Sequence, residues 1–151
     1  MPTCIEPARE QDLAQMTALL GHLFTQEADF QPNPAVQLRG LQRIFADPAQ
    51  GQLLVARDGP EILGMVSLLW STSTALGGRV AWLEDLVVAP DLRGQGLGRA
   101  LLKRAVALCR ERGLRRITLL TDGDNFRAQA LYASYGFQSS GMVPMRMLLD
   151  P

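Results

Sequence analysis

The segment from Leu86 to Arg104 constrains the fold of this chain more than any other part of the sequence. An apolar stretch runs into a turn that contains Gly94, Gly96 and Gly98, and a helical pattern follows it. The N–H groups of a first helical turn have no partner within the helix and lie at the positive end of its dipole. Glycines let such a backbone approach an anion closely. The segment therefore predicts a strand–turn–helix unit that cradles a phosphate or pyrophosphate group.

Single residue types exclude several other kinds of active site. The chain has one histidine, His22, whereas a catalytic triad or a zinc site usually needs histidine. It has no Gly-Lys-Ser/Thr run, which excludes a P-loop. Its two cysteines, Cys4 and Cys109, show no metal-ligand spacing, and we expect them to be reduced thiols of a cytoplasmic protein. We therefore expect no metal site.

The length and the apolar pattern bound the organisation of the chain and its partners. A length of 151 residues fits a single domain over residues 1–151. No stretch approaches the roughly 20 apolar residues of a membrane span, and the first six residues lack the features of a signal peptide. The arginine-rich helix after the glycine turn has no nucleic-acid readout motif beside it. We therefore expect neither a membrane nor a nucleic acid as a partner.

The hydrophobic periodicity predicts a mixed α/β fold in which helices cover both faces of a sheet. The predicted order of elements is β-α-α-β-β-β-α-β-α-β-β. Strands are expected at 4–7, 52–57, 62–72, 80–88 and 117–120, from 137, and at 142–149. Helices are expected at 12–24, 35–45, 97–112 and 125–135.

Two blocks of sequence resemble the signature of a known enzyme family. The first looks like the R/Q-x-x-G-x-G/A acetyl-CoA motif and reads Arg93-Gly94-Gln95-Gly96-Leu97-Gly98, after the approach strand 84–90. The second matches N-x-x-A-x-x-L-Y-x-x-x-G-F through Asn125, Ala128, Leu131, Tyr132, Gly136 and Phe137. Both blocks occur in this order in the GNAT N-acetyltransferase superfamily, which the chain resembles over about residues 3–149.

The resemblance implies a fold and a reaction. The fold is a single GNAT-like domain, with a central, mostly antiparallel and twisted sheet of about six to seven strands. Helices lie on both faces of that sheet, and a V-shaped splay separates its fourth and fifth strands. The implied reaction transfers the acetyl group of acetyl-CoA, the co-substrate, to a primary amine by direct nucleophilic attack. By resemblance alone, the last strand and its edge suggest a homodimer.

The resemblance also implies roles for individual residues. The turn 93–99 would bind the pyrophosphate, and strand residues 86–88 would bond to the pantetheine arm like an added strand. A backbone N–H near Val87 or Val88 would hold the developing oxyanion. Tyr132 would protonate the leaving thiolate. The implied acetyl-CoA-binding residues are Leu86, Val87, Val88, Arg93, Gly94, Gln95, Gly96, Leu97, Gly98, Arg99, Asn125 and Tyr132.

An acidic pair in the approach strand supplies candidates for the base. An alkylamine has a pKa near 10, so its attack at neutral pH requires deprotonation. Glu84 could accept the proton, directly or through water, if burial raises its pKa. Because successive strand residues point to opposite faces, we expect only one of Glu84 and Asp85 to face the acceptor. We favour Glu84, which resembles the acid at this place in polyamine-acetylating members, while Asp85 or a water chain stays an alternative.

The charge of the chain is divided unevenly along its length. Up to Leu92 it has eleven acids and five arginines, and from Arg93 it has ten basic residues and four acids. The basic part would meet the anionic CoA, and the acidic part, including Glu27 and Asp29, would favour a cationic amine. A small cationic primary amine is thus the preferred acceptor, although polyamines, amino acids, aminoglycosides and protein N-termini all stay open.

Two other functions stay open on the sequence alone. A non-catalytic acetyl-CoA-binding or regulatory module would bind the cofactor without turnover. A nucleotide-binding scaffold unrelated to CoA would prefer plain nucleotides, but it does not explain the second sequence block.

Overall fold

The structure is a computed structural model that describes residues 3–26 and 31–149. The chain divides into two compact units, Met1–Leu120 and Thr121–Pro151. Glu27 and Asp29, which are expected on the acceptor side, lie outside the described residues.

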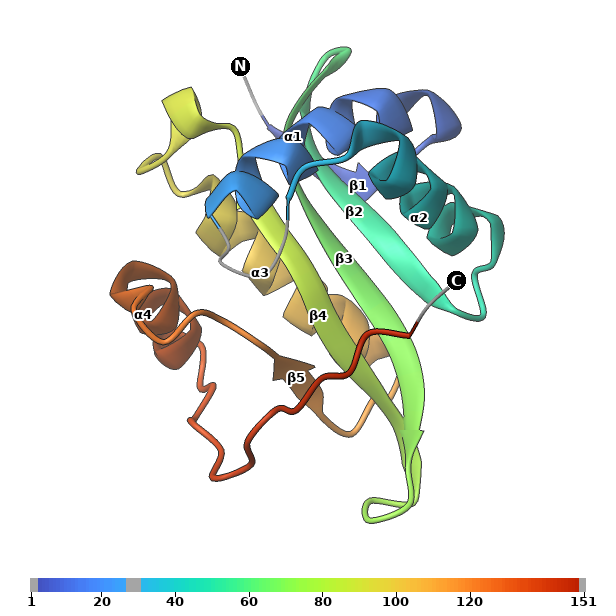
Figure 1. Ribbon diagram of the computed structural model, residues 1–151, viewed down its shortest axis with the longest axis vertical. Coiled ribbons are helices and arrows are strands. Elements are labelled where there is room, and N and C mark those ends of the chain that lie inside the picture. Colours follow the sequence, from blue (N-terminus) through green and yellow to red (C-terminus); the bar gives the residue numbers. More distant parts are fainter. Residues whose placement is uncertain (1–2, 27–30, 150–151) are drawn as a thin grey trace. The chain divides into compact units, whose positions relative to one another are not determined.

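The first unit contains one five-stranded sheet with the order β1-β2-β3-β4-β5. The first three pairings are antiparallel, and β5 runs parallel to β4. Figure 1 shows β2, β3 and β4 as long neighbouring strands in the middle of this unit. The strands are β1 (Cys4–Pro7), β2 (Gly51–Asp58), β3 (Glu61–Ser73), β4 (Gly78–Val88) and β5 (Ile117–Leu119).

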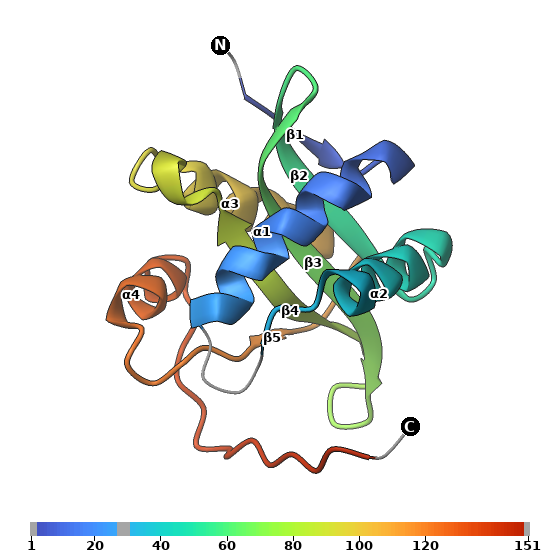
Figure 2. The same ribbon diagram turned by 45° about the horizontal axis from the view of Figure 1, so that its top comes forward.

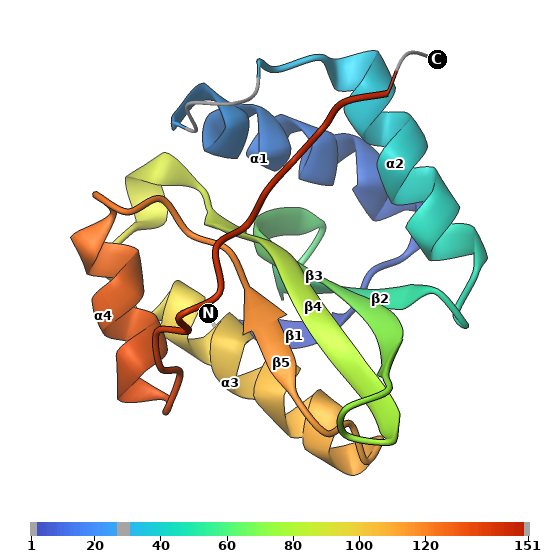
Figure 3. The same cartoon turned by 60° about the horizontal axis from the view of Figure 1, so that its bottom comes forward.

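Helices cover both faces of this sheet, as predicted. The face formed by Val55, Met65 and Val87 packs against the apolar side of α1 and against α2. The other face packs against α3, since a Cβ at Gly64 would lie 3.0 Å from a methyl carbon of Leu101. Figures 2 and 3 show α1 and α2 on one side of the sheet and α3 on the other. The helices of this unit are η1 (Glu10–Asp12), α1 (Leu13–Gln26), α2 (Pro34–Ala46), η2 (Pro90–Leu92) and α3 (Leu97–Glu111).

The pairing of β4 with β5 is short and covers only the first half of β4. Its three partner pairs run from Ala81 with Ile117 to Leu83 with Leu119. Beyond Leu83, β4 continues to Val88 without a parallel partner among the described residues. The expected splay between the fourth and fifth strands is therefore confirmed.

The second unit contains one described helix, α4 (Phe126–Ser134), and no described strand. The predicted strands that begin at Phe137 and cover Met142–Leu149 are therefore wrong, and the sheet has five strands rather than six or seven. Two features weaken a strand here: Pro144 has no N–H to donate to a ladder, and the apolar residues of 142–149 do not alternate cleanly.

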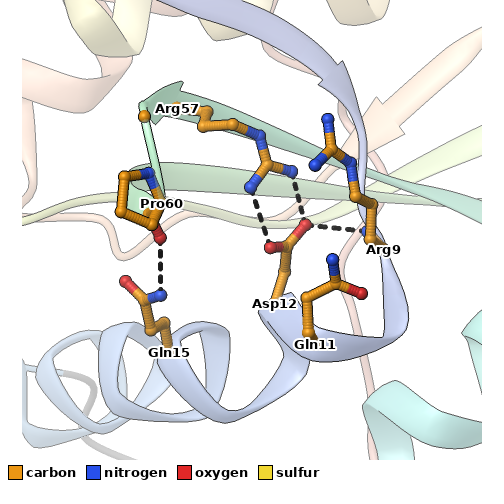
Figure 4. Close-up of a pocket in the computed structure, with 7 residues that line it drawn as sticks. Arg9, Gln11, Asp12, Gln15, Arg57 and Pro60 are labelled. Atoms are coloured by element: carbon orange, nitrogen blue, oxygen red, sulfur yellow. Dashed lines mark hydrogen bonds and ion pairs between the residues drawn. The ribbon is translucent and has the colours of Figure 1, made fainter.

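A buried ion-pair cluster joins β2 to the start of α1 (Figure 4). Arg57 and Asp12 are 8% and 2% exposed, and Nη1 of Arg57 donates to Oδ1 of Asp12 over 2.9 Å. Nε of Arg57 donates to Glu6 over 2.7 Å, and the backbone N–H of Arg9 donates to Asp12 over 2.8 Å. Asp12 therefore anchors the turn before α1 from inside.

Candidate active site

The glycine turn after β4 adopts the local geometry that an anion cradle requires. Gly94 and Gly96 have φ values of 83° and 86°, in the left-handed region that favours glycine. Gly96 caps α3, and its carbonyl accepts the N–H of Ala100 over 3.0 Å. The N–H groups of Leu97 and Gly98 precede this first helical bond, so they have no acceptor within α3. The turn thus presents backbone donors at the positive end of the α3 dipole.

The second half of β4 offers an open edge beside this turn. Leu86 and Val88 are half-buried and Val87 is buried, so the strand is held by the core. Its antiparallel bonds go to β3, whereas β5 stops pairing at Leu83. The backbone groups of the second half on the β5 side can therefore bond to an extended ligand, as an added strand would.

A β-bulge in β4 changes the direction of the acidic pair. Leu83 pairs with Leu68 and Leu86 with Val66, so two β4 residues oppose the one β3 residue between them. Because Leu68 and Val66 share a face of β3, Leu83 and Leu86 share a face of β4. The two residues between them, Glu84 and Asp85, therefore both lie on the α1 face. Our expectation that Glu84 and Asp85 point to opposite faces is wrong for this reason.

The two acids differ in their surroundings although they share a face. Glu84 is exposed, whereas Asp85 is half-buried and accepts a hydrogen bond of 3.0 Å from Oγ of Ser67. Burial raises the pKa of Asp85 to about 6, the Ser67 hydrogen bond acts in the opposite direction, and the nearby charge of Glu84 raises the pKa further. Asp85 is thus the acid whose protonation changes near neutral pH.

Ser67 is a candidate site residue that the sequence analysis missed. It lies within an apolar strand, 18 residues before Asp85, and no spacing rule links the two. The available signal was the pair Glu84–Asp85 itself, because two successive acids in an apolar strand break the alternation of a regular ladder.

The second unit holds the two predicted site residues that follow β5. The side chain of Asn125 caps α4 by accepting the N–H of Ala128 over 3.1 Å. The ring of Tyr132 packs edge-to-face on Phe137, with 5.9 Å between the ring centroids. Burial raises the pKa of Tyr132, so its phenol stays protonated at neutral pH.

Two other kinds of feature are absent from the described residues. Over 3–26 and 31–149, no group of three or more His, Cys, Asp or Glu side chains is arranged to hold a metal ion. In the same residues, no helix has the length and apolarity that a membrane crossing demands.

Comparison with known proteins gives the family. The family model described as "Acetyltransferase (GNAT) family" matches residues 14–137. The chain belongs to this GNAT acetyltransferase family. The matched residues include the glycine turn and the block that contains Asn125 and Tyr132.

Individual similar proteins also have acetyltransferase names. The GNAT chain is 29% identical over 141 residues to an aminoalkylphosphonate N-acetyltransferase of Salmonella typhimurium, covering 93% of this chain and 88% of that protein. It is 34% identical over 131 residues to a mycothiol acetyltransferase of Propionibacterium freudenreichii, covering 85% of this chain but 41% of that protein. A protein of Clostridium acetobutylicum described as a predicted acetyltransferase, solved with acetyl-CoA, shares the fold with a TM-score of 0.79 at 18% identity, covering 96% of both chains. The protein is therefore an N-acetyltransferase that uses acetyl-CoA.

Proposed function

We propose that this GNAT enzyme transfers the acetyl group of acetyl-CoA to a small, cationic primary amine by direct nucleophilic attack. The observation that carries the proposal is the sequence of features along β4: two acids at a bulge, an open strand edge, and then the glycine turn that caps α3. In the proposed complex, the acids would bind the acceptor amine, the open edge would lie beside the thioester, and the turn would bind the pyrophosphate.

The open edge and the turn are the proposed site for acetyl-CoA. The N–H groups from Arg93 to Arg99 would bind the pyrophosphate, and residues 86–88 would bond to the pantetheine. A backbone N–H near Val87 or Val88 would hold the oxyanion of the tetrahedral intermediate. Asn125 would lie beside the pantetheine, a role that rests on its place in the matched sequence block.

Two side chains would move protons in the proposed reaction. One acid of the bulge, Glu84 or Asp85, would take the proton of the acceptor ammonium. Tyr132 would give its phenolic proton to the leaving thiolate, which its protonated state at neutral pH permits. Direct attack fits the state of the two thiols: burial raises the pKa of Cys109 to about 11, and the hydrogen bond to Glu6 raises the pKa of Cys4, so both stay protonated.

A cationic acceptor fits the acids at the bulge and the acidic first part of the sequence. The relative from Salmonella is named for an aminoalkyl substrate, which supports an alkylamine as the acceptor class. We also propose that the enzyme acts in the cytoplasm, needs no metal and forms a homodimer, without nucleic acid or a membrane as a partner.

The test is free-thiol release from acetyl-CoA with a panel of amines, followed by mass spectrometry of each product. The panel includes 1,4-diaminobutane, an amino acid, an aminoglycoside and a peptide with a free N-terminus. We expect 1,4-diaminobutane to accelerate thiol release and to gain one acetyl group. A preference for the neutral or acidic acceptors contradicts the cationic class, and acetyl-CoA binding without any acetylated product favours a binding module.

Replacing Gly96 by alanine tests the turn as the cofactor site. A Cβ added at Gly96 would meet open space, so the substitution causes no clash, but φ of 86° strains any other residue by about 1–2 kcal/mol. The free turn of Gly96→Ala can relax and must return to this φ to bind the pyrophosphate, so we expect acetyl-CoA binding to weaken about 5–30-fold, measured by calorimetry. Gly21→Ala is the matched control, because Gly21 also has open space but no positive φ. Equal affinities in the two variants would remove the turn from the site.

A further inference from the structure

One buried hydroxyl group contacts the bulge in β4, and none of the roles proposed above uses it. Ser67 of β3 is 0% exposed, and its Oγ donates to Oδ2 of Asp85 over 3.0 Å. The bulge makes this contact possible, because it places two β4 residues opposite Ser67 and directs Asp85 to the same face.

We propose that Ser67 is a positioning residue that holds Asp85 as the group that takes the proton from the acceptor ammonium. The inference rests on the proposed acetyl transfer and names the residues that start it. Ser67 binds Oδ2 of Asp85, which leaves Oδ1 to accept a hydrogen bond from the ammonium. Asp85 directly precedes the open edge 86–88, so an amine bound there lies next to the proposed thioester position.

The proton balance of the step is simple. Oδ1 of Asp85 takes one proton from R–NH₃⁺, which leaves the neutral amine with its lone pair. That lone pair attacks the thioester carbonyl, so a C–N bond forms and the C–S bond breaks. The nitrogen then loses a second proton while the thiolate gains one, and Asp85 releases its proton to solvent. The products are the N-acetyl amine, CoA thiol and one proton.

Burial favours Asp85 over Glu84 for this step. Glu84 is exposed, so its carboxylate is solvated and is suited to attracting the ammonium by charge. Asp85 is half-buried, with a pKa of about 6, and a general base works best when its pKa lies near the working pH. Each acid of the pair therefore has a separate task on the same face.

Among the described residues of the first unit, two side chains act on the pKa of Asp85. Ser67 faces it from β3 and Glu84 from its own strand. The helix over this face, α1, packs its apolar side on the sheet, and its one titratable residue, His22, is exposed. Variants of Ser67 and Glu84 should therefore change the titration of Asp85 directly.

The first experiment compares Asp85→Asn with Glu84→Gln, using acetyl-CoA and 1,4-diaminobutane from pH 5 to pH 9. The asparagine keeps an oxygen for the Ser67 hydroxyl but cannot take the proton. We expect Asp85→Asn to lower kcat at least about 100-fold. We also expect it to abolish the acid limb of the pH profile, which is the fall in rate below about pH 6. We expect Glu84→Gln to raise the KM for the diamine and to keep an acid limb, moved to lower pH because the charge of Glu84 no longer raises the pKa of Asp85. The opposite assignment of the two effects overturns the proposal.

The second experiment tests whether Ser67 sets the pH at which this acid limb lies. Its hydroxyl stabilises the ionised carboxylate, so its removal raises the pKa of Asp85. We expect Ser67→Ala to move the acid limb of kcat/KM up by about one pH unit. Ser73→Ala is the matched control: Ser73 is also buried on β3, but its Oγ accepts the N–H of Leu76 in the hairpin. A limb that stays in place in Ser67→Ala, or moves equally in Ser73→Ala, overturns the proposal.

A carboxyl ¹³C titration of the wild type separates this inference from the proposed function. We expect the Asp85 signal to titrate near pH 6 and to shift when 1,4-diaminobutane binds. No acetyl transfer to any amine contradicts the proposed function. Transfer by the wild type together with full activity of Asp85→Asn contradicts only the role of Asp85 and Ser67.

Discussion

Arg57→Ala is expected to lower the free energy of unfolding by about 3 kcal/mol. The change leaves the carboxylate of Asp12, which is 2% exposed, without its charged partner. Breaking a buried pair typically costs about 3–5 kcal/mol, and the lower end applies here because the backbone N–H of Arg9 still donates to Asp12. The measurement is urea unfolding followed by circular dichroism.

Arg104→Ala is the matched control for this prediction. Arg104 forms an ion pair of 3.5 Å with Glu111 on the surface, where the two side chains are 38% and 62% exposed. Exposed pairs contribute roughly 0–1 kcal/mol, so this variant should unfold nearly as the wild type does. Equal losses in the two variants would show that the cluster at Arg57 contributes no more than a surface pair.

The same cluster predicts a loss of stability in acid. The hydrogen bonds from Arg57 lower the pKa values of Asp12 and Glu6 in the folded protein. A carboxylate whose pKa is lower in the folded than in the unfolded protein stabilises the fold above its unfolded pKa, about 4. This stability is lost as the pH falls through the folded pKa. Arg57→Ala should therefore flatten the decline of stability below pH 4, since it removes the largest cause of both lowered pKa values, whereas the contacts of the two carboxylates with Arg9 remain.

The parts of the fold that depend on neighbouring residues were predictable from the sequence. The helix expected at 97–112 ends at the predicted place, where Gly113 has a φ of 72° and the N–H of Leu114 bonds to the carbonyl of Cys109. The helix expected at 125–135 likewise begins at the predicted place, where the side chain of Asn125 accepts the N–H of Ala128. Such signals work because both partners lie within a few residues of each other.

The parts that depend on strand pairing were not predictable in the same way. The bulge at Glu84–Asp85 exists only in relation to Ser67 on β3, and strict alternation therefore gave the wrong faces. Arg57 and Asp12 lie 45 residues apart, and neither position has a local signal of the other. The sequence alone therefore identified the two acids of the candidate site, but it did not identify the Ser67 hydroxyl that hydrogen-bonds to Asp85.

Tyr132→Phe is expected to lower kcat at least about 100-fold and to leave the acetyl-CoA Kd within about twofold. The change removes only the phenolic proton that the thiolate would take. The phenylalanine ring keeps the edge-to-face packing on Phe137, so α4 and its surroundings should stay folded. The measurements are steady-state thiol release and calorimetric titration with acetyl-CoA.

The other tyrosine of the chain, Tyr135, supplies the control for this experiment. It lies at the end of α4, three residues after Tyr132, at a position that the sequence block leaves unspecified. Tyr135→Phe should therefore keep the wild-type kcat. A wild-type kcat in Tyr132→Phe would remove Tyr132 as the acid, and the thiolate would then leave unprotonated or take its proton from water. A loss of both kcat and acetyl-CoA affinity would instead assign Tyr132 to cofactor binding.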